Sequence, residues 1–392
     1  MLALVLPIEL FEHAIDTLGD EDSLRATSLV CKAWLPRSRL NLFRVIRLSV
    51  LGHLDRLVCL VFNAPHLLEY VEEIEVSENT FLGVLRPAET IVARLPAVLS
   101  AHPIIQPRLF AVHNQFWLPT RYGLGYLRSL SQLSSVTSLE LNDVTFTTLA
   151  DFSIILRALS HLKSLSANHL ECERQLDPEI ASDIGCTMAS LTFLRVSSTQ
   201  RTTVVDWLFR YNTFPSLRRV DCKYALSASR DDGQAIGALW ENAGSTLEEI
   251  SINISKRDAG AFPLRVIERQ LDLSHCHILR TLRFDCRHDR NAIPDWTWLS
   301  WLLSHLTSHT LRSIEFAFES SSHALASMPV FAAELDRVLT SALFFDGLEA
   351  IFFAFDYRDE ADPDDGRFVN MFPALRDSHL LRVYNLDQRW PR

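Results

Sequence analysis

Five residues in the last third of the chain have side chains that can bind a metal ion: His275, Cys276, His277, Cys286 and His288. Structural zinc sites use four His or Cys ligands, and their cysteines usually come in closely spaced pairs. No such pair of cysteines occurs here. We therefore expect no metal site in this cluster, and the chain suggests no other cofactor.

A second candidate for metal chemistry is the acidic run at 356–366, because carboxylates are the ligands that calcium prefers. If Glu360 takes the first position of a calcium loop, Asp365 falls where a glycine is needed and Met371 where a bidentate carboxylate is needed. The run is therefore interpreted as an exposed loop. The chain also lacks a glycine-rich phosphate-binding motif and a GxSxG nucleophile motif, so we expect no enzymatic activity.

The composition favours a protein that binds other proteins. The chain has 392 residues, of which 48% are hydrophobic and 22% charged, and this is enough to bury a large core. Its net charge is −10 and it has no Lys/Arg tract, so we expect no nucleic-acid partner. The scattered cysteines, the poor secretion signal and the lack of a long apolar segment indicate a cytoplasmic and/or nuclear location and no membrane partner.

The first fifty residues predict three short helices, and these helices must position any functional side chains of this segment. Pro7 begins the first helix, Asp22 or Ser23 caps the second, and a third amphipathic stretch through Trp34 ends at Pro36. Three helices of this size cannot close a core alone. Another surface must therefore cover part of them.

The order of residues in this segment resembles an F-box. The matching elements are Leu6-Pro7-x-Glu9-Leu10, Asp22-Ser23-Leu24, the stretch 28–34 and Leu42-Phe43-Arg44. The resemblance implies a three-helix domain over residues 1–50 that docks on the Skp-type adaptor of a cullin ubiquitin ligase. The residues that would contact this adaptor, or hold the contacts in place, are Leu6, Pro7, Leu10, Ile15, Leu18, Leu24, Val30, Cys31 and Trp34. Each of them could instead lie in the core of the helices, because cores and interfaces use the same residue types.

Beyond residue 60 one short pattern recurs: an apolar residue, two spacers, an apolar residue, one spacer and usually a third apolar residue. From Val136 onward successive copies start 26 to 37 residues apart, with helical stretches between them. The copies start at Val71, Val136, Leu162, Leu191, Leu217, Leu247, Leu279, Leu311, Leu348 and Leu380. A unit of this kind cannot bury its apolar face alone, so the copies must stack into a solenoid. Between 77 and 135 the pattern is lost, and 88–101 with 108–117 could form one aberrant unit.

The copies resemble leucine-rich repeats but depart from them at one position. Where such repeats place a buried Asn or Cys, this chain has other residues, among them Val144 and Leu170. We therefore expect a degenerate leucine-rich-repeat-like solenoid over residues 51–392, packed continuously onto the F-box, a layout of fungal style. The predicted fold class is α/β: a small all-α domain, then a parallel sheet with helices on its convex side.

The spacer residues of each copy are expected to face the open side of the sheet, because side chains alternate along a strand. Solenoids use such arrays to bind partners. The candidates for binding a target protein are Glu140, Arg195, Asp221, Lys223, Asn253, Arg283, Asp285 and Glu315, and Arg219 and Glu249 occupy equivalent spacer positions. The alternative for each residue is a polar side chain that simply faces water.

These patterns lead to one functional hypothesis and one alternative. The hypothesis is a non-catalytic substrate adaptor, which binds the Skp-type adaptor through residues 1–50 and an unknown target through the solenoid. The alternative is a scaffold that binds the same adaptor without directing ubiquitination. Stabilisation of a bound target when the cullin is inhibited would favour the first, and an unchanged half-life would favour the second.

Overall fold

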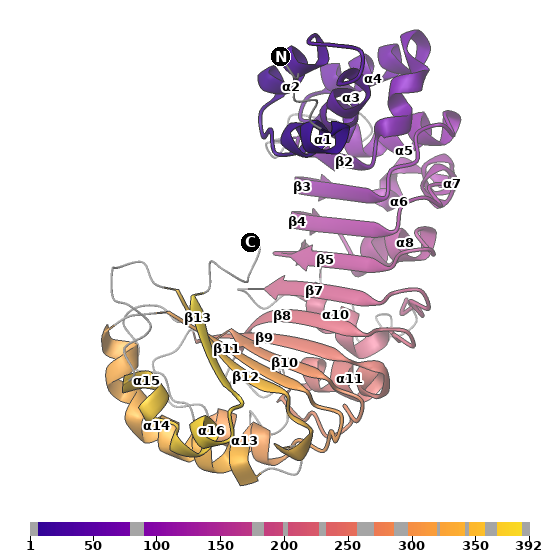
Figure 1. Cartoon of the computed structure of the whole chain (residues 1–392). Coiled ribbons are helices and arrows are strands. Elements are labelled where there is room, and N and C mark those ends of the chain that lie inside the picture. The colour runs from indigo at the N-terminus through magenta and orange to yellow at the C-terminus, as the bar shows by residue number, and fades with distance from the viewer. Residues whose placement is uncertain are drawn as a thin grey trace, which may run out of the picture. The chain divides into compact units, whose positions relative to one another are not determined.

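A computed structural model describes residues 7–78, 90–174, 184–198, 203–226, 233–256, 270–285, 297–319, 322–341, 345–356 and 367–385. Leu6, Cys286, His288 and most of the acidic run lie outside these ranges. The chain divides into two compact units, Met1–Leu162 and Lys163–Arg392, each with its own run of parallel strands (Figure 1). The boundary between the units falls within the predicted solenoid.

Unit 1 begins with three short helices, as the sequence predicts. They are α1 (Ile8–Asp16), α2 (Glu21–Ser28) and α3 (Leu35–Phe43). The prediction that Asp22 or Ser23 caps the second helix is wrong, because α2 already begins at Glu21 and its cap is Asp20. The Asp20 side chain accepts a hydrogen bond from the Ser23 backbone N–H at 2.7 Å. The prediction that Pro36 ends the third helix is wrong: α3 begins there, with Pro36 in its first turn. Proline suits that position because it lacks an N–H that would find no partner in the first turn.

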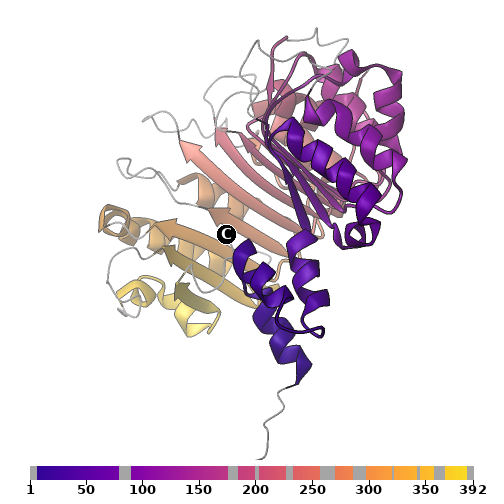
Figure 2. The same cartoon turned by 90° about the horizontal axis from the view of Figure 1, so that it is seen from above.

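The rest of unit 1 is a parallel sheet with helical connections. Its strands follow chain order: β1 (Val45–Leu48), β2 (Glu73–Val76), β3 (Leu109–Trp117) and β4 (Ser138–Phe146). The connections contain α4 (Leu51–Asn63), η1 (Pro65–Tyr70), α5 (Ile91–Ala101), α6 (Pro119–Tyr122), α7 (Leu124–Ser131) and α8 (Leu149–Ala158). Figure 2 shows these helices along one face of the strands. The aberrant unit predicted between 77 and 135 is thus α5 followed by β3, whereas β1 lies in a segment for which no strand was predicted.

Unit 2 repeats the strand, turn and helix arrangement. The parallel strands run in the order β5 (Ser164–Asn168), β7 (Phe193–Ser198), β8 (Arg219–Leu226), β9 (Glu249–Lys256), β10 (Thr281–Asp285), β11 (Ser313–Glu319), β12 (Ala350–Asp356) and β13 (Leu381–Asn385). The other elements are β6 (Glu171–Cys172), α10 (Thr203–Tyr211), α11 (Gly233–Ala243), η3 (Gly244–Thr246), α13 (Thr297–Ser304), α14 (Ser322–Ser341), η4 (Phe345–Gly347), α15 (Arg367–Asn370) and α16 (Pro373–Asp377). In Figure 1 α10, α11, α13 and α14 lie on one side of the strands, and the strands curve around the other side. Each copy of the predicted pattern coincides with a strand, which confirms the solenoid of strand and helix units.

The core of unit 2 is built from equivalent apolar positions stacked across the strands. Phe284, Phe316 and Phe353 are register partners on β10, β11 and β12, and their rings lie 5.4 and 5.0 Å apart. All three are buried. Phe372 continues the stack at 4.8 Å from Phe353. A parallel sheet thus turns one position of the sequence repeat into a continuous apolar column.

The backbone between repeats is satisfied without a ladder of buried asparagines. One carbonyl per repeat accepts hydrogen bonds from two successive N–H groups of the next repeat. In unit 2, for example, the carbonyl of Arg218 accepts from Glu248 and Glu249, and the carbonyl of Arg280 accepts from Arg312 and Ser313. The position where leucine-rich repeats place Asn is therefore free to carry apolar residues, and Val144 and Leu170 are buried there.

In some turns between repeats, a buried side chain also forms hydrogen bonds with the backbone. Asn212 is fully buried, donates to the carbonyls of Trp207 and Leu208 at 3.2 and 3.1 Å, and accepts from the Cys186 backbone N–H at 3.0 Å. It thereby connects the last turn of α10 to the backbone at Cys186. Within the described ranges, no helix combines the length and apolarity that crossing a bilayer demands.

Candidate protein-docking surfaces

The three N-terminal helices are held together by a polar clamp between α1 and α3. The Arg37 guanidinium donates to both carboxylate oxygens of Asp16, with Nε at 2.6 Å from Oδ1, and Asn41 Nδ2 donates to the same oxygen at 2.8 Å. The hydrogen bond from Arg37 is the main reason that the pKa of Asp16 falls to about 2. The clamp fixes how the apolar residues of α1 lie relative to those of α3.

The interior of this three-helix module contains some of the residues that the F-box resemblance implies as contacts. Ile15 and Leu24 are only 3% and 6% exposed, so they form the core of the module. Trp34 and Leu18 are half-buried. The Trp34 ring packs on Phe11, with 5.3 Å between ring centroids, and this contact brings the start of α1 to the turn that precedes α3.

Other apolar residues of the module are left in solvent. Leu10 is 55% exposed and Val30 60% exposed, and Pro7 and Cys31 are exposed as well. Sequence reasoning missed two residues of the same kind, Ile8 and Leu29, the latter 86% exposed. We call these residues the module patch: Pro7, Ile8, Leu10, Leu29, Val30 and Cys31. The signal for Leu29 is its place directly after the last residue of α2, where it no longer follows the buried stripe of a helix.

The candidate target-binding residues fall on the strands as predicted. Arg195, Asp221, Arg283 and Glu315 occupy one register row across β7, β8, β10 and β11. Lys223, Asn253 and Asp285 occupy the row two residues further along β8, β9 and β10. Glu140 lies on β4 of unit 1 and is therefore part of a different unit from these seven residues.

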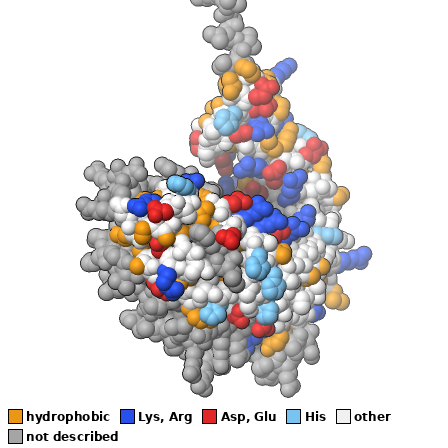
Figure 3. Space-filling view, turned by 60° about the horizontal axis from the view of Figure 1, so that its bottom comes forward, with side chains coloured by type: hydrophobic (Ala, Val, Ile, Leu, Met, Phe, Trp, Pro, Cys, Tyr) orange, Lys and Arg blue, Asp and Glu red, His pale blue; other side chains and the backbone are white. Residues whose placement is uncertain are grey.

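Parallel register places opposite charges side by side, about 4.8 Å apart along the row. Arg195 Nε lies 2.9 Å from Asp221 Oδ2, and Arg283 Nε lies 2.9 Å from Glu315 Oε2. Asn253 Nδ2 donates to Asp285 Oδ2 at 2.7 Å. The polar spacers therefore pair with each other across neighbouring repeats, and Figure 3 shows Lys and Arg side chains beside Asp and Glu side chains.

The expectation that all of these spacers are open to solvent is wrong for β10 to β12. Asp285 and Glu315 are 9% and 5% exposed. Ala317 and Ala354, in the same register row as Asp285, are buried, with Tyr384 packed against them. On β7 and β8, by contrast, Arg195 and Lys223 are exposed. The accessible part of the strand face lies on the earlier strands of unit 2.

This accessible part also contains residues that were not predicted. Two guanidinium groups lie over the Phe193 ring, with the Cζ atoms of Arg195 and Arg219 at 5.6 and 5.2 Å from its centroid. Lys163 and Arg218 are exposed just before β5 and β8. We call this group the basic patch: Lys163, Phe193, Arg195, Arg218, Arg219 and Lys223. Lys163, Arg218 and Phe193 all occupy spacer positions of the repeat pattern, which is the signal that could have identified them.

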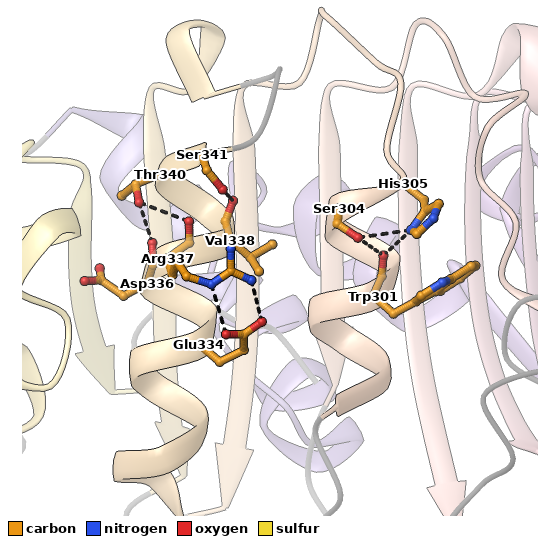
Figure 4. Close-up of polar contacts among 9 residues, drawn as sticks. All are labelled: Trp301, Ser304, His305, Glu334, Asp336, Arg337, Val338, Thr340 and Ser341. Atoms are coloured by element: carbon orange, nitrogen blue, oxygen red, sulfur yellow. Dashed lines mark hydrogen bonds and ion pairs between the residues drawn. The ribbon is translucent and has the colours of Figure 1, made fainter.

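Figure 4 shows polar side chains of α13 and α14 that bond mainly to neighbours in the chain. Buried Asp336 of α14 instead accepts hydrogen bonds from the backbone N–H groups of Ala374 and Leu375 on α16, at 3.0 and 2.9 Å. On α14 the Arg337 guanidinium donates to both carboxylate oxygens of Glu334, at 2.7 and 3.1 Å. At the end of α13, His305 Nδ1 lies 2.8 Å from the Trp301 carbonyl oxygen, and its ring stacks on Trp301 at 4.4 Å. Each of these side chains already has a bonding partner within the protein, so we propose no binding site at these helices.

Of the five metal-ligand residues, the structure describes three: His275, Cys276 and His277. His275 and His277 are exposed, whereas Cys276 is buried, and burial raises the pKa of its thiol to about 12. A thiol with this pKa stays protonated at neutral pH and is a poor nucleophile. In the described part of the chain, no three His, Cys, Asp or Glu residues are grouped so that they could hold a metal ion.

Comparison with known proteins gives no family for this chain. No model of a protein family matches it, and no curated protein matches its sequence. Among solved structures, a protein of Bacteroides fragilis matches with a TM-score of 0.39 and 13% identity, covering 64% of this chain and 72% of the other. Internalin C2 of Listeria monocytogenes matches with a TM-score of 0.28 and 14% identity, covering 66% and 83%. Likenesses this weak carry no argument about function.

Proposed function

We propose that the chain is a substrate-recognition subunit of a Skp-cullin-F-box type ubiquitin ligase. In this proposal the three-helix module docks on a Skp-type adaptor, and the strand face of unit 2 binds a target protein. The chain itself performs no chemistry, because ubiquitin transfer belongs to other subunits of such a ligase. It acts by holding the target near them.

The observation that carries the proposal is how the module divides its apolar residues. Ile15 and Leu24 are buried, whereas Pro7, Leu10 and Val30, which belong to the same F-box-like motif, are exposed. A folded module that leaves such residues in water gains free energy when a partner covers them. Hence the module patch, and not the buried pair, is the surface that we propose for the adaptor.

The strand face supports the second half of the proposal. Solenoids bind partners through the exposed side chains of successive repeats. In unit 2 these side chains are held by cross-strand ion pairs such as Arg195 with Asp221, so their positions are defined before a partner arrives. An ordered surface of this kind lowers the entropy cost of binding.

The proposal is tested by measuring the binding of a purified Skp-type adaptor to the full chain by calorimetry. Replacing Leu10 and Val30 with serine, one at a time, is expected to weaken binding about thirtyfold each, since a central anchor residue contributes about 2 kcal/mol. The matched control is Leu124→Ser on α7, where the side chain is 86% exposed and lies outside the module.

Both exposed positions can be changed without opening the core, and circular dichroism should show the same fold for all three variants. Equal binding by the Leu10→Ser, Val30→Ser and Leu124→Ser variants would contradict the docking assignment. A wild-type chain that binds no Skp-type adaptor would contradict the proposed function as a whole.

A further inference from the structure

We propose that the basic patch on β5, β7 and β8 binds an acidic peptide segment of the target protein. This inference rests on the second half of the proposed function, which is target binding by the strand face of unit 2. It names the chemistry of the target: an extended segment whose Asp or Glu side chains reach the guanidinium groups of Arg195 and Arg219.

The first argument is local charge. The patch contains five cations, and the carboxylates beside them are Asp221, Glu248 and Glu249, so this area is net basic in a chain whose net charge is −10. Lys163 and Lys223 are exposed and have no ion-pair partner among the described residues. An anionic partner would balance this excess positive charge.

The second argument is the geometry of the two guanidinium groups. Both lie over the Phe193 ring, which holds the long side chains in place. Each uses only Nε in its closest ion pair, Arg195 with Asp221 at 2.9 Å and Arg219 with Glu249 at 3.5 Å. Among the described residues, the terminal Nη groups of both arginines therefore stay available to donate. Two parallel N–H groups of a guanidinium match the two oxygens of a carboxylate.

A peptide fits this patch better than a nucleic acid does. A nucleic acid brings a phosphate with every nucleotide, so some phosphates would meet Asp221, Glu248 or Glu249. A peptide can place neutral residues opposite these carboxylates and acidic residues opposite the arginines. The patch spans about 10 Å across β5, β7 and β8. About three extended residues cross this distance, so a peptide of about ten residues covers the patch and extends beyond it.

The test is fluorescence anisotropy with the full chain and a fluorescein-labelled peptide of about ten residues that alternates glutamate with glycine. The double variant Arg195→Gln/Arg219→Gln is expected to weaken binding about tenfold. The matched control is Arg94→Gln/Arg128→Gln, which removes two exposed cations from α5 and α7. The control variant should bind within about twofold of wild type.

Arg195→Lys/Arg219→Lys separates geometry from charge, because lysine keeps the charge and loses the paired donors. We expect its affinity to lie between those of the wild type and the glutamine variant. If the double variants fail to fold, Lys223→Gln removes an exposed cation that has no partner in the described structure, and it should still weaken binding measurably.

Equal loss in the control variant would overturn the inference, because binding would then follow net charge alone. Tighter binding of a labelled DNA single strand of the same length would also overturn it, in favour of a nucleic-acid site. Binding of the Skp-type adaptor is measured in parallel and should be the same for all these variants. Failure of the acidic-peptide inference is thereby distinguished from failure of the proposed function.

Discussion

Replacing Asp16 with asparagine is expected to loosen the three-helix module by about 1 kcal/mol. The pKa of Asp16 drops from 3.8 to about 2 because Arg37 donates to its carboxylate. Without screening this drop corresponds to about 2.4 kcal/mol. The side chains of Arg37 and Asp16 are 34% and 31% exposed, so solvent reduces the contribution to about 1 kcal/mol.

The sign of the pH dependence follows from the lowered pKa. A carboxylate with a depressed pKa in the folded state stabilises that state above its unfolded pKa, and the contribution is lost as the pH falls through the folded pKa. The clamp is therefore fully effective above about pH 5, contributes about half as much at pH 3 and little near pH 2.

The assay is hydrogen–deuterium exchange of the α1 amides, normalised to an unfolded peptide at each pH. At pH 7 the Asp16→Asn variant should exchange about fivefold faster than the wild type, and at pH 3 only about twofold faster. The control is Asp22→Asn, because the Asp22 side chain is 94% exposed and, among the described residues, forms an ion pair only with exposed Arg25, at 3.2 Å. If the α1 amides exchange at the same rate in the Asp16→Asn and Asp22→Asn variants, the clamp does not hold the module together.

Three further predictions concern unit 2 and the cysteines. Asn212→Ala should lower the free energy of unfolding by about 2–3 kcal/mol in urea titrations, because it removes three hydrogen bonds between a fully buried side chain and the backbone. A loss below about 1 kcal/mol would contradict this. Gly244→Ala should lower the free energy of unfolding by about 1–3 kcal/mol in thermal melts, because the new Cβ would lie 2.9 Å from His275 Cβ. The control is Gly52→Ala, whose new Cβ meets nothing within 4 Å and should not destabilise the protein. Iodoacetamide at about pH 8 should label exposed Cys31 and leave buried Cys276, whose pKa is raised to about 12, unmodified by mass spectrometry; early labelling of Cys276 would refute its burial.

Much of the fold could be predicted because the repeat pattern is local. The two spacers between apolar residues mark the start of each strand, and β7, for instance, begins two residues after Leu191. Alternation along a strand then predicts which side chains share a face. Pro36 was interpreted incorrectly because the same residue can follow one helix or begin the next, and the sequence around it allows both.

The docking residues could be predicted only in part. The motif marks Leu10, Ile15, Leu24 and Val30 equally, but two of them are buried and two exposed. Burial depends on how α1, α2 and α3 pack, and the Asp16–Arg37 clamp that sets this packing joins residues 21 positions apart in the chain. No local pattern contains that information.

The sequence by itself determined where most of the strands lie, that they repeat, and that polar side chains occupy many spacer positions on one face of the strands. These properties follow from interactions between residues close together in the chain. Only the tertiary structure decided that Glu315 is covered while Arg195 is open, and that Phe193 holds two arginines from neighbouring strands. Exposure and cross-strand contact depend on what packs against each side chain from distant repeats, so they arise only when the repeats are stacked.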